Sequence, residues 1–394
     1  MLSDDDLRHL RRCLELAARG RATTAPNPCV GSVIVRDGEV VGEGWHRRAG
    51  GPHAEIDALR AAGQRARGAT AYVSLEPCAH HGRTPPCADA LVEAGVARVV
   101  ACHRDPDPRV AGGGFARLEA AGIEVAWGGL VDEAVRLNWR FLAAIVQRRP
   151  AVTLKWAMSL DGKIATHTGD SQWISSPEGR QWALELREEH DAILVGSGTA
   201  LADDPRLTRR LGQAEGPIVR IVLDRRLRLA PTARLFTVDG PVLVYTEAAD
   251  TEVADTEIAD TEGADTETAE AARATRREEL TRAGAEVVVL ERVEPTAVLG
   301  DLARRGVQSL LVEGGGSVAA AFAEAAAFDR VAVCCAPRLL GGETAPGPLR
   351  GSGFATLAEA PRLADLQVTR RGPDLVFTAF RETCLQDLFK SVVD

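Results

Sequence analysis

The sequence predicts an α/β protein built from two domains. The chain has 394 residues, whereas one domain usually holds about 100–200 residues. Strand-like and helix-like segments alternate through its first part, and Pro150 ends the last long helical pattern of that part. A second alternation then starts with a new apolar strand. We therefore expect one domain at residues 1–149 and another at 150–394, each a sheet with helices packed on it.

The first domain opens with an amphipathic helix, because residues 4–20 place leucines at helical spacing. Two strand-like runs, 29–35 and 39–45, then flank Asp37-Gly38, which is typical of a hairpin turn. The segments that follow are a helix at 53–63, a strand at 70–75, a helix at 88–95, a strand at 98–102, a helix at 115–122, a strand at 123–127 and a helix at 130–148.

The second domain repeats this pattern with longer apolar strands. None of its glycine-rich segments has the G-x-G-x-x-G spacing, so the dinucleotide-binding fingerprint of a Rossmann fold is absent. Helical stretches lie between many of the strands. The expected strands are 151–159, 191–196, 217–224, 241–246, 285–290, 309–315, 330–337 and two more near the C-terminal end.

An acidic repeat interrupts the second domain. The unit A-D-T-E-x occurs four times in a row from Ala249 to Thr268, and residues 247–270 contain ten acidic residues and no lysine or arginine. Such a segment cannot bury enough apolar surface to offset the entropy lost on ordering. We therefore expect a disordered insertion near 247–270 in a surface loop, the alternative being an interaction segment for a basic partner.

Charge and composition exclude several classes of protein. The net charge is −9, and the acidic repeat accounts for nearly all of it, so the rest of the chain lacks the basic field of a nucleic-acid-binding protein. The longest apolar runs, such as 141–146, are too short to span a bilayer, and the first residues do not resemble a signal peptide. Eight cysteines in this length do not suggest a disulfide scaffold. We expect a cytoplasmic homo-oligomer with no nucleic-acid or membrane partner.

The strongest local pattern is H-A-E at residues 53–55, followed by Pro77-Cys78 and Cys87. Zinc binds neutral imidazole and thiolates in a tetrahedral site, and three protein ligands leave one position for a water molecule. Zinc lowers the pKa of that water toward about 7, and Glu55 is suited to carry its proton to a leaving amine. Pro77 suits the first turn of a helix, so we expect Cys78 at a helix N-terminus, where the dipole favours thiolate.

Two other interpretations of this pattern stay open. The zinc deaminase signature is H-x-E followed by P-C-x-x-C, but here the second cysteine comes nine positions after the first. On the first of these interpretations, the three residues are a core histidine and two unrelated buried cysteines that bind no metal. Alternatively, they would form a structural zinc module in a binding protein, although such a site needs a fourth ligand rather than a base beside it.

In the second domain, polar and glycine-rich residues interrupt the strands at four motifs: LKWAMSLDGKIA, GDSQWIS, GSGTALADDPRLTRR and LLVEGGGS. The three glycines at 314–316 follow a strand and suit either a simple turn or a cradle for phosphate. Asp203-Asp204 suits a turn with a helix cap. Arg187 and Arg210 suit a phosphate, yet a surface role is equally common in a chain with 44 arginines.

The motifs PNPCVGSVIV, GEGWH, GGPHAEIDAL, SLEPCAHHGRTPPC and DPDPRVAGGG of the first half together resemble the deaminase domain of the bifunctional riboflavin-biosynthesis deaminase–reductase family. The long cysteine spacing is the norm there. The resemblance implies a cytidine-deaminase-like fold, with zinc on His53, Cys78 and Cys87 and with Glu55 as the proton carrier. Arg83 stands where the family often has lysine, and Asp107 where it often has asparagine. The implied substrate contacts are Asn27, His46, His80, Arg83 and Asp105.

The motifs of the second half resemble the reductase domain of the same family, which has a dihydrofolate-reductase-like fold and uses NADPH. The resemblance implies that Lys155 and Asp203 lie nearest the reacting sugar as the catalytic side chains. The implied cofactor contacts are Ala157, Trp173, Thr199, Asp203, Gly314, Gly315 and Gly316. The implied substrate contacts are Ser171, Arg187, Leu207, Arg210 and Glu313.

The resemblance to this family therefore implies a bifunctional enzyme that acts on a small phosphoribosyl pyrimidine. The first domain would hydrolyse the 2-amino group of 2,5-diamino-6-(5-phosphoribosylamino)pyrimidin-4(3H)-one, and the second would reduce its ribosyl group to ribityl with NADPH. The alternative is a zinc deaminase of another nucleotide with a reductase-like domain that is not catalytic. The PNP, GRTPPC and ADDP loops argue against that alternative, as does the lack of a basic groove.

Overall fold

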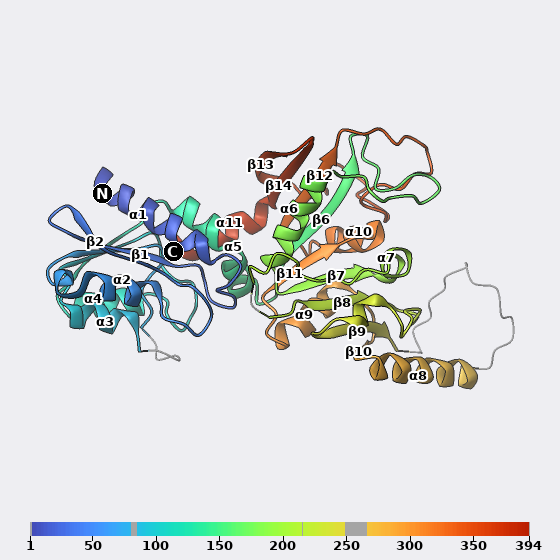
Figure 1. The fold of residues 1–394 in the computed structure, drawn as a ribbon, viewed down its shortest axis with the longest axis horizontal. Coiled ribbons are helices and arrows are strands. Elements are labelled where there is room, and N and C mark those ends of the chain that lie inside the picture. Colours follow the sequence, from blue (N-terminus) through green and yellow to red (C-terminus); the bar gives the residue numbers. More distant parts are fainter. Residues whose placement is uncertain (1, 80–84, 215, 249–265, 394) are drawn as a thin grey trace. The chain divides into compact units, whose positions relative to one another are not determined.

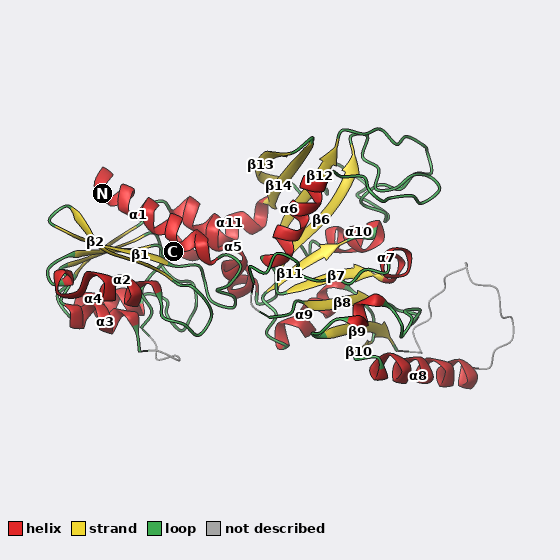
Figure 2. Ribbon diagram, viewed as in Figure 1, coloured by secondary structure: helices red, strands yellow, loops and turns green. Residues whose placement is uncertain are grey.

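In the computed structural model the chain divides into two compact units, Met1–Ala151 with Thr383–Asp394, and Val152–Glu382. The structure describes residues 2–79, 85–214, 216–248 and 266–393 (Figures 1 and 2). Both units combine a β-sheet with helices, as the sequence predicts. The last helix, α11 (Glu382–Val393), was expected in the second domain. It lies with the first unit instead, because its apolar face is buried there and Gln147 donates a hydrogen bond to Cys384 Sγ at 3.3 Å.

The first unit is built on a five-stranded sheet with the order β2-β1-β3-β4-β5. β1 runs antiparallel to β2 and β3, whereas β3, β4 and β5 are parallel. Asp37 and Gly38 both have positive φ, 51° and 80°, which suits the tight turn of the predicted hairpin. The strands are β1 (Gly31–Arg36), β2 (Glu39–Trp45), β3 (Thr70–Val73), β4 (Arg98–Ala101) and β5 (Glu124–Trp127).

Helices cover both faces of this sheet (Figure 1). Successive strand residues point to opposite faces of the sheet. Val33 therefore packs with Leu10 of α1, on the face that α1 and α5 cover. Ile34 packs on the opposite face, with Leu91 of α3 and Phe115 of α4. The helices are α1 (Asp4–Ala17), α5 (Val131–Gln147), α2 (Ala54–Ala62), α3 (Cys87–Ala94) and α4 (Gly113–Ala120), and short 3₁₀ turns lie at Ala18–Gly20 and Gly63–Ala66.

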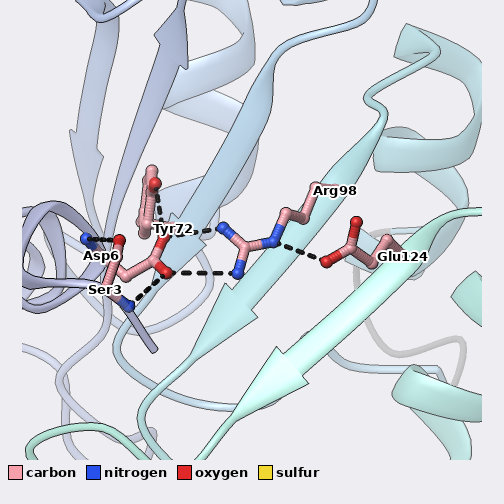
Figure 3. Close-up of polar contacts among 5 residues, drawn as sticks. All are labelled: Ser3, Asp6, Tyr72, Arg98 and Glu124. Carbon is pink, nitrogen blue, oxygen red and sulfur yellow. Dashed lines mark hydrogen bonds and ion pairs between the residues drawn. The ribbon is translucent and has the colours of Figure 1, made fainter. Parts of the chain in front are cut away.

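A polar cluster ties α1 to the sheet (Figure 3). Ser3 and Asp6 form a capping box at the start of α1, and Tyr72 donates to Asp6 Oδ1 at 2.9 Å. Arg98 donates to both oxygens of Asp6, at 2.7 and 3.2 Å, and to Glu124 at 2.9 Å. Burial alone would raise the pKa of the Asp6 carboxyl, but these hydrogen bonds hold it well below its ordinary value.

The second unit is built on a nine-stranded sheet with the order β10-β9-β8-β7-β11-β6-β12-β14-β13. The pairs from β10 to β7, β7 with β11, and β6 with β12 are parallel, and β14 is antiparallel to β12 and β13. The strands are β6 (Ala151–Ser159), β7 (Ala192–Gly196), β8 (Val219–Leu223), β9 (Val242–Glu247), β10 (Ala285–Leu290), β11 (Ser309–Glu313), β12 (Arg330–Ala336), β13 (Leu363–Arg371) and β14 (Asp374–Arg381).

Helices again cover both faces. Leu299 and Phe322 of α9 and α10 pack on one face of the sheet, whereas Trp182 of α6, Ala200 of α7 and Leu280 of α8 pack on the other. The helices are α6 (Pro177–Glu188), α7 (Ser197–Asp203), α8 (Thr266–Arg282), α9 (Pro295–Arg304) and α10 (Gly316–Glu324), with a 3₁₀ turn at Arg234–Thr237. None of the described helices combines the length and the apolar composition that a bilayer span requires.

The expected disordered insertion is partly wrong. Residues 249–265 of the acidic repeat lie outside the described part of the chain, but Glu247 ends β9 and helix α8 already begins at Thr266. Glu247 is buried and accepts the Val293 N–H at 3.0 Å. The sequence of α8 is rich in alanine, glutamate and arginine, which are strong helix formers, so residues 266–270 continue into this helix.

Candidate functional sites

The three expected metal ligands meet at one point of the first unit. His53 is the N-cap residue of α2, Cys87 is the first residue of α3, and Cys78 lies in the loop after β3. Their ligand atoms lie within 4.8 Å of one another, with His53 Nδ1 3.2 Å from Cys87 Sγ and 3.6 Å from Cys78 Sγ. Bond lengths of a tetrahedral zinc site separate such atoms by about 3.6 Å, so the donor set fits zinc.

The helix expected to begin at Pro77 begins at Cys87 instead. The residue before a proline avoids the α-helical conformation. Because Pro85 precedes Pro86, helix α3 begins only at Cys87. Cys78 still benefits from this helix, because the N–H of Cys87 donates to Cys78 Sγ at 3.3 Å. Hydrogen bonds from Cys87 and His53 lower the pKa of the Cys78 thiol below its ordinary value, which favours the thiolate that a metal needs.

Glu55 lies directly beside the ligands without belonging to them. It is the second residue of α2 and only 3% exposed. Burial raises the pKa of its carboxyl to about 6. Oxygen Oε2 is buried and has no hydrogen-bond partner among the described residues, so it is available to exchange a proton.

Two of the expected substrate contacts, Asn27 and His46, contact each other beside the expected ligand His53. His46 Nδ1 lies 2.9 Å from the carbonyl oxygen of Pro52, so this nitrogen is the donor and Nε2 accepts from Asn27 Nδ2 at 3.0 Å. Burial lowers the pKa of His46, which keeps the ring neutral. Its ring centre lies 5.3 Å from that of His53, edge to face. Asn27 and His46 therefore hold each other in place beside the ligand His53.

Asp105 lies in the loop after β4 and is buried. Burial, with like charge from Asp107 and Glu76, raises the pKa of its carboxyl to about 7. Asp107 differs from the family pattern and is engaged by Arg109, which donates to both carboxylate oxygens at about 3.0 Å. Asp107 therefore orders this loop. His80 and Arg83 lie outside the described residues.

The second unit brings together Lys155, Arg187 and Glu313. Arg187 of α6 donates to both carboxylate oxygens of Glu313, each at 2.9 Å, and Lys155 Nζ of β6 lies 3.8 Å from Glu313 Oε2. Glu313 ends β11 and is 8% exposed. Burial alone would raise its pKa, but the two cations lower it to about 2. Arg187 is thus held by Glu313, which limits its availability to a substrate phosphate.

Positive charge gathers around Arg210, in the loop after α7. Burial and the neighbouring charges of Arg187, Arg206 and Arg234 all lower its pKa. The backbone N–H of Arg234 donates to Asp204 Oδ1 at 2.8 Å, which brings its segment to this loop. Such mutual repulsion is relieved when an anion binds, so the loop suits a phosphate.

The glycines at 314–316 form the turn between β11 and α10. Gly314 and Gly315 have positive φ, 105° and 78°, and a Cβ on Gly314 would lie 3.2 Å from Thr199. Gly316 begins α10. The turn therefore places a glycine-rich segment at a helix N-terminus, an arrangement that favours phosphate groups.

The remaining expected contact residues of the second unit are not linked to Lys155 and Glu313 by hydrogen bonds or ion pairs among the described residues. Asp203 ends α7 and accepts from Gln172 Nε2 at 3.1 Å, whereas Trp173 is 61% exposed with Arg180 over its ring. The side chain of Leu207 is buried in the core, so only its backbone could face a substrate. Among the described residues, no hydrogen bond or ion pair joins Ser171 or Ala157 to Lys155 and Glu313.

Sequence reasoning missed several buried polar residues around these sites. Asn138 of α5 accepts from the N–H of Cys29 at 2.7 Å and donates to its carbonyl at 2.9 Å, which fixes the loop that carries Asn27. Glu76 and Glu188 each accept several backbone N–H groups. For Glu76 the only available signal was a charged residue shortly after an apolar strand, in SLEPC. Asn138 and Glu188 lie in helices, where a polar residue is ordinary, so they gave no signal.

Two family models match the chain. Residues 3–103 match the cytidine and deoxycytidylate deaminase zinc-binding region, and residues 150–377 match the RibD C-terminal domain. Among curated proteins, the riboflavin biosynthesis protein RibD of Bacillus amyloliquefaciens is 43% identical over 375 residues, covering 94% of this chain and 95% of its own. The protein of the same name from Escherichia coli strain K12 is 42% identical over 379 residues, covering 93% and 97%.

Solved structures agree with these matches. Acinetobacter baumannii RibD is 36% identical, with a TM-score of 0.82 over 95% of this chain and 98% of its own. A diaminohydroxyphosphoribosylaminopyrimidine deaminase/5-amino-6-(5-phosphoribosylamino)uracil reductase from Thermotoga maritima is 33% identical, with a TM-score of 0.78 over 96% and 99%. Both likenesses extend over the two units.

Proposed function

Since the chain belongs to the RibD family of bifunctional riboflavin-biosynthesis deaminase–reductases, we propose that its first unit deaminates and its second unit reduces one phosphoribosyl pyrimidine. The chain is accordingly a zinc-dependent hydrolase and an oxidoreductase that uses a nicotinamide cofactor. The substrate would be 2,5-diamino-6-(5-phosphoribosylamino)pyrimidin-4(3H)-one, which loses its 2-amino group before its ribosyl group is reduced to ribityl.

In the first unit, His53, Cys78 and Cys87 would hold the zinc, which when bound supplies an activated water at neutral pH. Glu55 would take a proton from the attacking water and return it to the departing amine. Its burial and raised pKa suit both halves of this transfer, because a base near its working pH can also act as an acid. Asn27, His46 and Asp105 would orient the pyrimidine, together with His80 and Arg83.

In the second unit, Lys155 and Asp203 would lie nearest the sugar carbon that receives hydride. Lys155 is held by Glu313, so its ammonium would carry the proton that the reduced sugar oxygen needs. Arg210 and the surrounding positive charge would bind the substrate phosphate, and Ser171, Arg187, Glu313 and the backbone of Leu207 would contact the rest of the substrate.

We propose NADPH as the nicotinamide cofactor, which when bound supplies the hydride. The glycine turn 314–316 at the start of α10 would hold its phosphates, since backbone N–H groups at a helix N-terminus favour anions. Thr199 lies against this turn. Ala157, Trp173 and Asp203 would line the remainder of the cofactor site.

Two further features of the proposal concern assembly and location. We propose a homo-oligomer, because the edge strand β13 exposes Leu363, Leu366 and Val368, and an apolar sheet edge favours pairing with another chain. All eight cysteines are free, which supports a reducing compartment such as the cytoplasm.

The observation that carries the proposal is the buried Glu55 beside a three-ligand set that fits zinc, with a separate polar cluster around Lys155 in the other unit. The test is a two-part assay of the purified chain with the diaminopyrimidine, measuring ammonia release and NADPH oxidation. We expect both, and slower oxidation of NADH. Ammonia release without any oxidation of either nucleotide would favour the alternative, a deaminase with a non-catalytic second unit.

A further inference from the structure

Each proposed site depends on a loop without regular secondary structure. In the second unit residues 204–214 carry Arg210, and in the first unit residues 103–112 carry Asp105. A loop binds a substrate well only when its backbone is fixed before binding, because otherwise the ordering entropy is lost at that step. The question is therefore what fixes these two loops.

Glu188 fixes the loop of the second unit. It is the last residue of α6, and its side chain is buried, with 1% of the residue exposed. One carboxylate oxygen accepts the N–H groups of Arg210 and Leu211, at 3.1 and 2.9 Å. The other accepts those of Gln213 and Ala214, at 3.1 and 2.9 Å. One side chain thus satisfies four of the loop's backbone donors.

These hydrogen bonds also decide the charge of Glu188. Burial alone would raise the pKa of its carboxyl, but the four N–H groups lower it below its ordinary value. The charged form is therefore the one that holds the loop. The neighbouring residue Arg187 adds a second support, since its carbonyl accepts from Arg209 Nε at 3.2 Å.

Glu76 does the same in the first unit. It lies two residues before the ligand Cys78 and is 3% exposed. Oε2 accepts the N–H groups of Asp105 and Gly112, both at 3.1 Å. Oε1 accepts those of Gly114 and Phe115, at 2.9 and 3.2 Å, at the start of α4. The carboxylate therefore joins the metal-ligand loop to the loop of Asp105.

We propose that Glu188 and Glu76 are positioning residues, one for each reaction, that place Arg210 and Asp105 for substrate binding through four backbone hydrogen bonds each. The inference rests on the proposed placement of Arg210 and Asp105 at the substrate. Glutamine cannot replace either carboxylate, because its amide NH₂ would face two N–H donors. The Glu→Gln variants keep the shape of the side chain and lose half of the hydrogen bonds.

The test in the second unit is a double-mutant cycle of Glu188→Gln and Arg210→Gln, with the already deaminated substrate. We expect Glu188→Gln to raise KM for this substrate about tenfold, equivalent to about 1.4 kcal/mol, with kcat within about twofold and KM for NADPH unchanged. Because Glu188 acts through Arg210, the double variant should have the KM of Arg210→Gln alone. Glu185→Gln is the control, since it removes a charge from the same helix and breaks only the ion pair with Arg371.

Two results would overturn this half of the inference. Either KM is unchanged in Glu188→Gln while Arg210→Gln raises it, or the two effects multiply in the double variant, as separate structural losses would. If Arg210→Gln leaves KM unchanged although both reactions proceed, the placement of Arg210 is wrong and the inference falls with it. If Glu188→Gln does not fold, Glu188→Asp takes its place in the cycle, since it keeps the charge but is one methylene too short to reach all four donors.

The matching test in the first unit pairs Glu76→Gln with Asp105→Asn and measures ammonia release. We expect KM for the diaminopyrimidine to rise about tenfold in Glu76→Gln, with zinc content unchanged. The double variant should have the KM of Asp105→Asn alone. Glu93→Gln on the exposed surface of α3 is the control. Unchanged KM, or loss of zinc that by itself accounts for the lost ammonia release, would overturn the role of Glu76. Each variant should spare the reaction of the other unit.

Discussion

Replacing Glu313 with glutamine should destabilise the second unit and disable reduction. Glu313 is the only carboxylate to which an ion pair joins both Arg187 and Lys155 among the described residues. Glutamine keeps the volume of the side chain but removes its charge. The two cations, with side chains only 13% and 15% exposed, would then repel each other without a counter-charge.

The size of the effect follows from the pKa of Glu313. The carboxyl titrates at about 2 in the folded protein against an ordinary value of 4.5, and each pKa unit corresponds to about 1.4 kcal/mol. The charged form therefore contributes roughly 3 kcal/mol to folding. Because the folded pKa is depressed, this contribution is fully present above about pH 4.5 and is lost as the pH falls toward 2.

Thermal unfolding of Glu313→Gln and of the parent chain at several pH values provides the assay. At neutral pH the transition of the second unit should fall by roughly 6–12 °C, given about 2–4 °C per kcal/mol for a unit of this size. The difference should shrink below about pH 4. Glu286→Gln, which breaks an exposed ion pair with Arg305, should cost less than about 1 kcal/mol. An equal shift in both variants, or one independent of pH, would refute the reasoning.

Three further predictions concern the two sites and the α1 cluster. Glu55→Gln should keep its zinc, measured by metal analysis, and lose ammonia release by about 10²–10⁴-fold; loss of the metal would identify Glu55 as a ligand. Asp203→Ala should stay folded, release ammonia normally and lose NADPH oxidation, so oxidation at the parent rate would contradict the second site. Arg98→Met should cost about 2 kcal/mol at neutral pH, because it leaves Asp6 buried without its cation; the cost should diminish below about pH 4, where unfolded Asp6 gains a proton, and a cost independent of pH would contradict this account.

The fold could be predicted largely from local patterns. The hairpin turn at Asp37-Gly38 requires positive φ, which aspartate and glycine tolerate. The strands from β6 to β12 are apolar runs of ordinary length, so a few consecutive residues are enough to predict each of them. The grouping of residues 383–394 with the first unit was not predicted, because the apolar face of a helix does not reveal which unit it packs against. The predicted C-terminal limit of the acidic insertion was also wrong, because the acidic repeat passes without a sharp change in composition into the helix-forming sequence of α8.

The candidate sites could be predicted only where a motif carries the chemistry. His53, Cys78 and Cys87 were predicted because histidine and cysteine are characteristic zinc ligands and because the motifs around them resemble a known family. The pairing of Arg187 with Glu313 spans 126 positions, and the carboxylates of Glu76 and Glu188 act on backbone groups that any sequence presents. Such interactions leave no local pattern, so only the structure reveals them.

The most direct test of the account measures both reactions in His53→Ala. The account holds that the two reactions occur at separate sites, with the zinc ligands confined to the first unit. With the diaminopyrimidine as substrate, the variant should release no ammonia. With the already deaminated substrate, it should oxidise NADPH at the parent rate. Ammonia release at the parent rate, or loss of NADPH oxidation in a folded variant, would contradict the account.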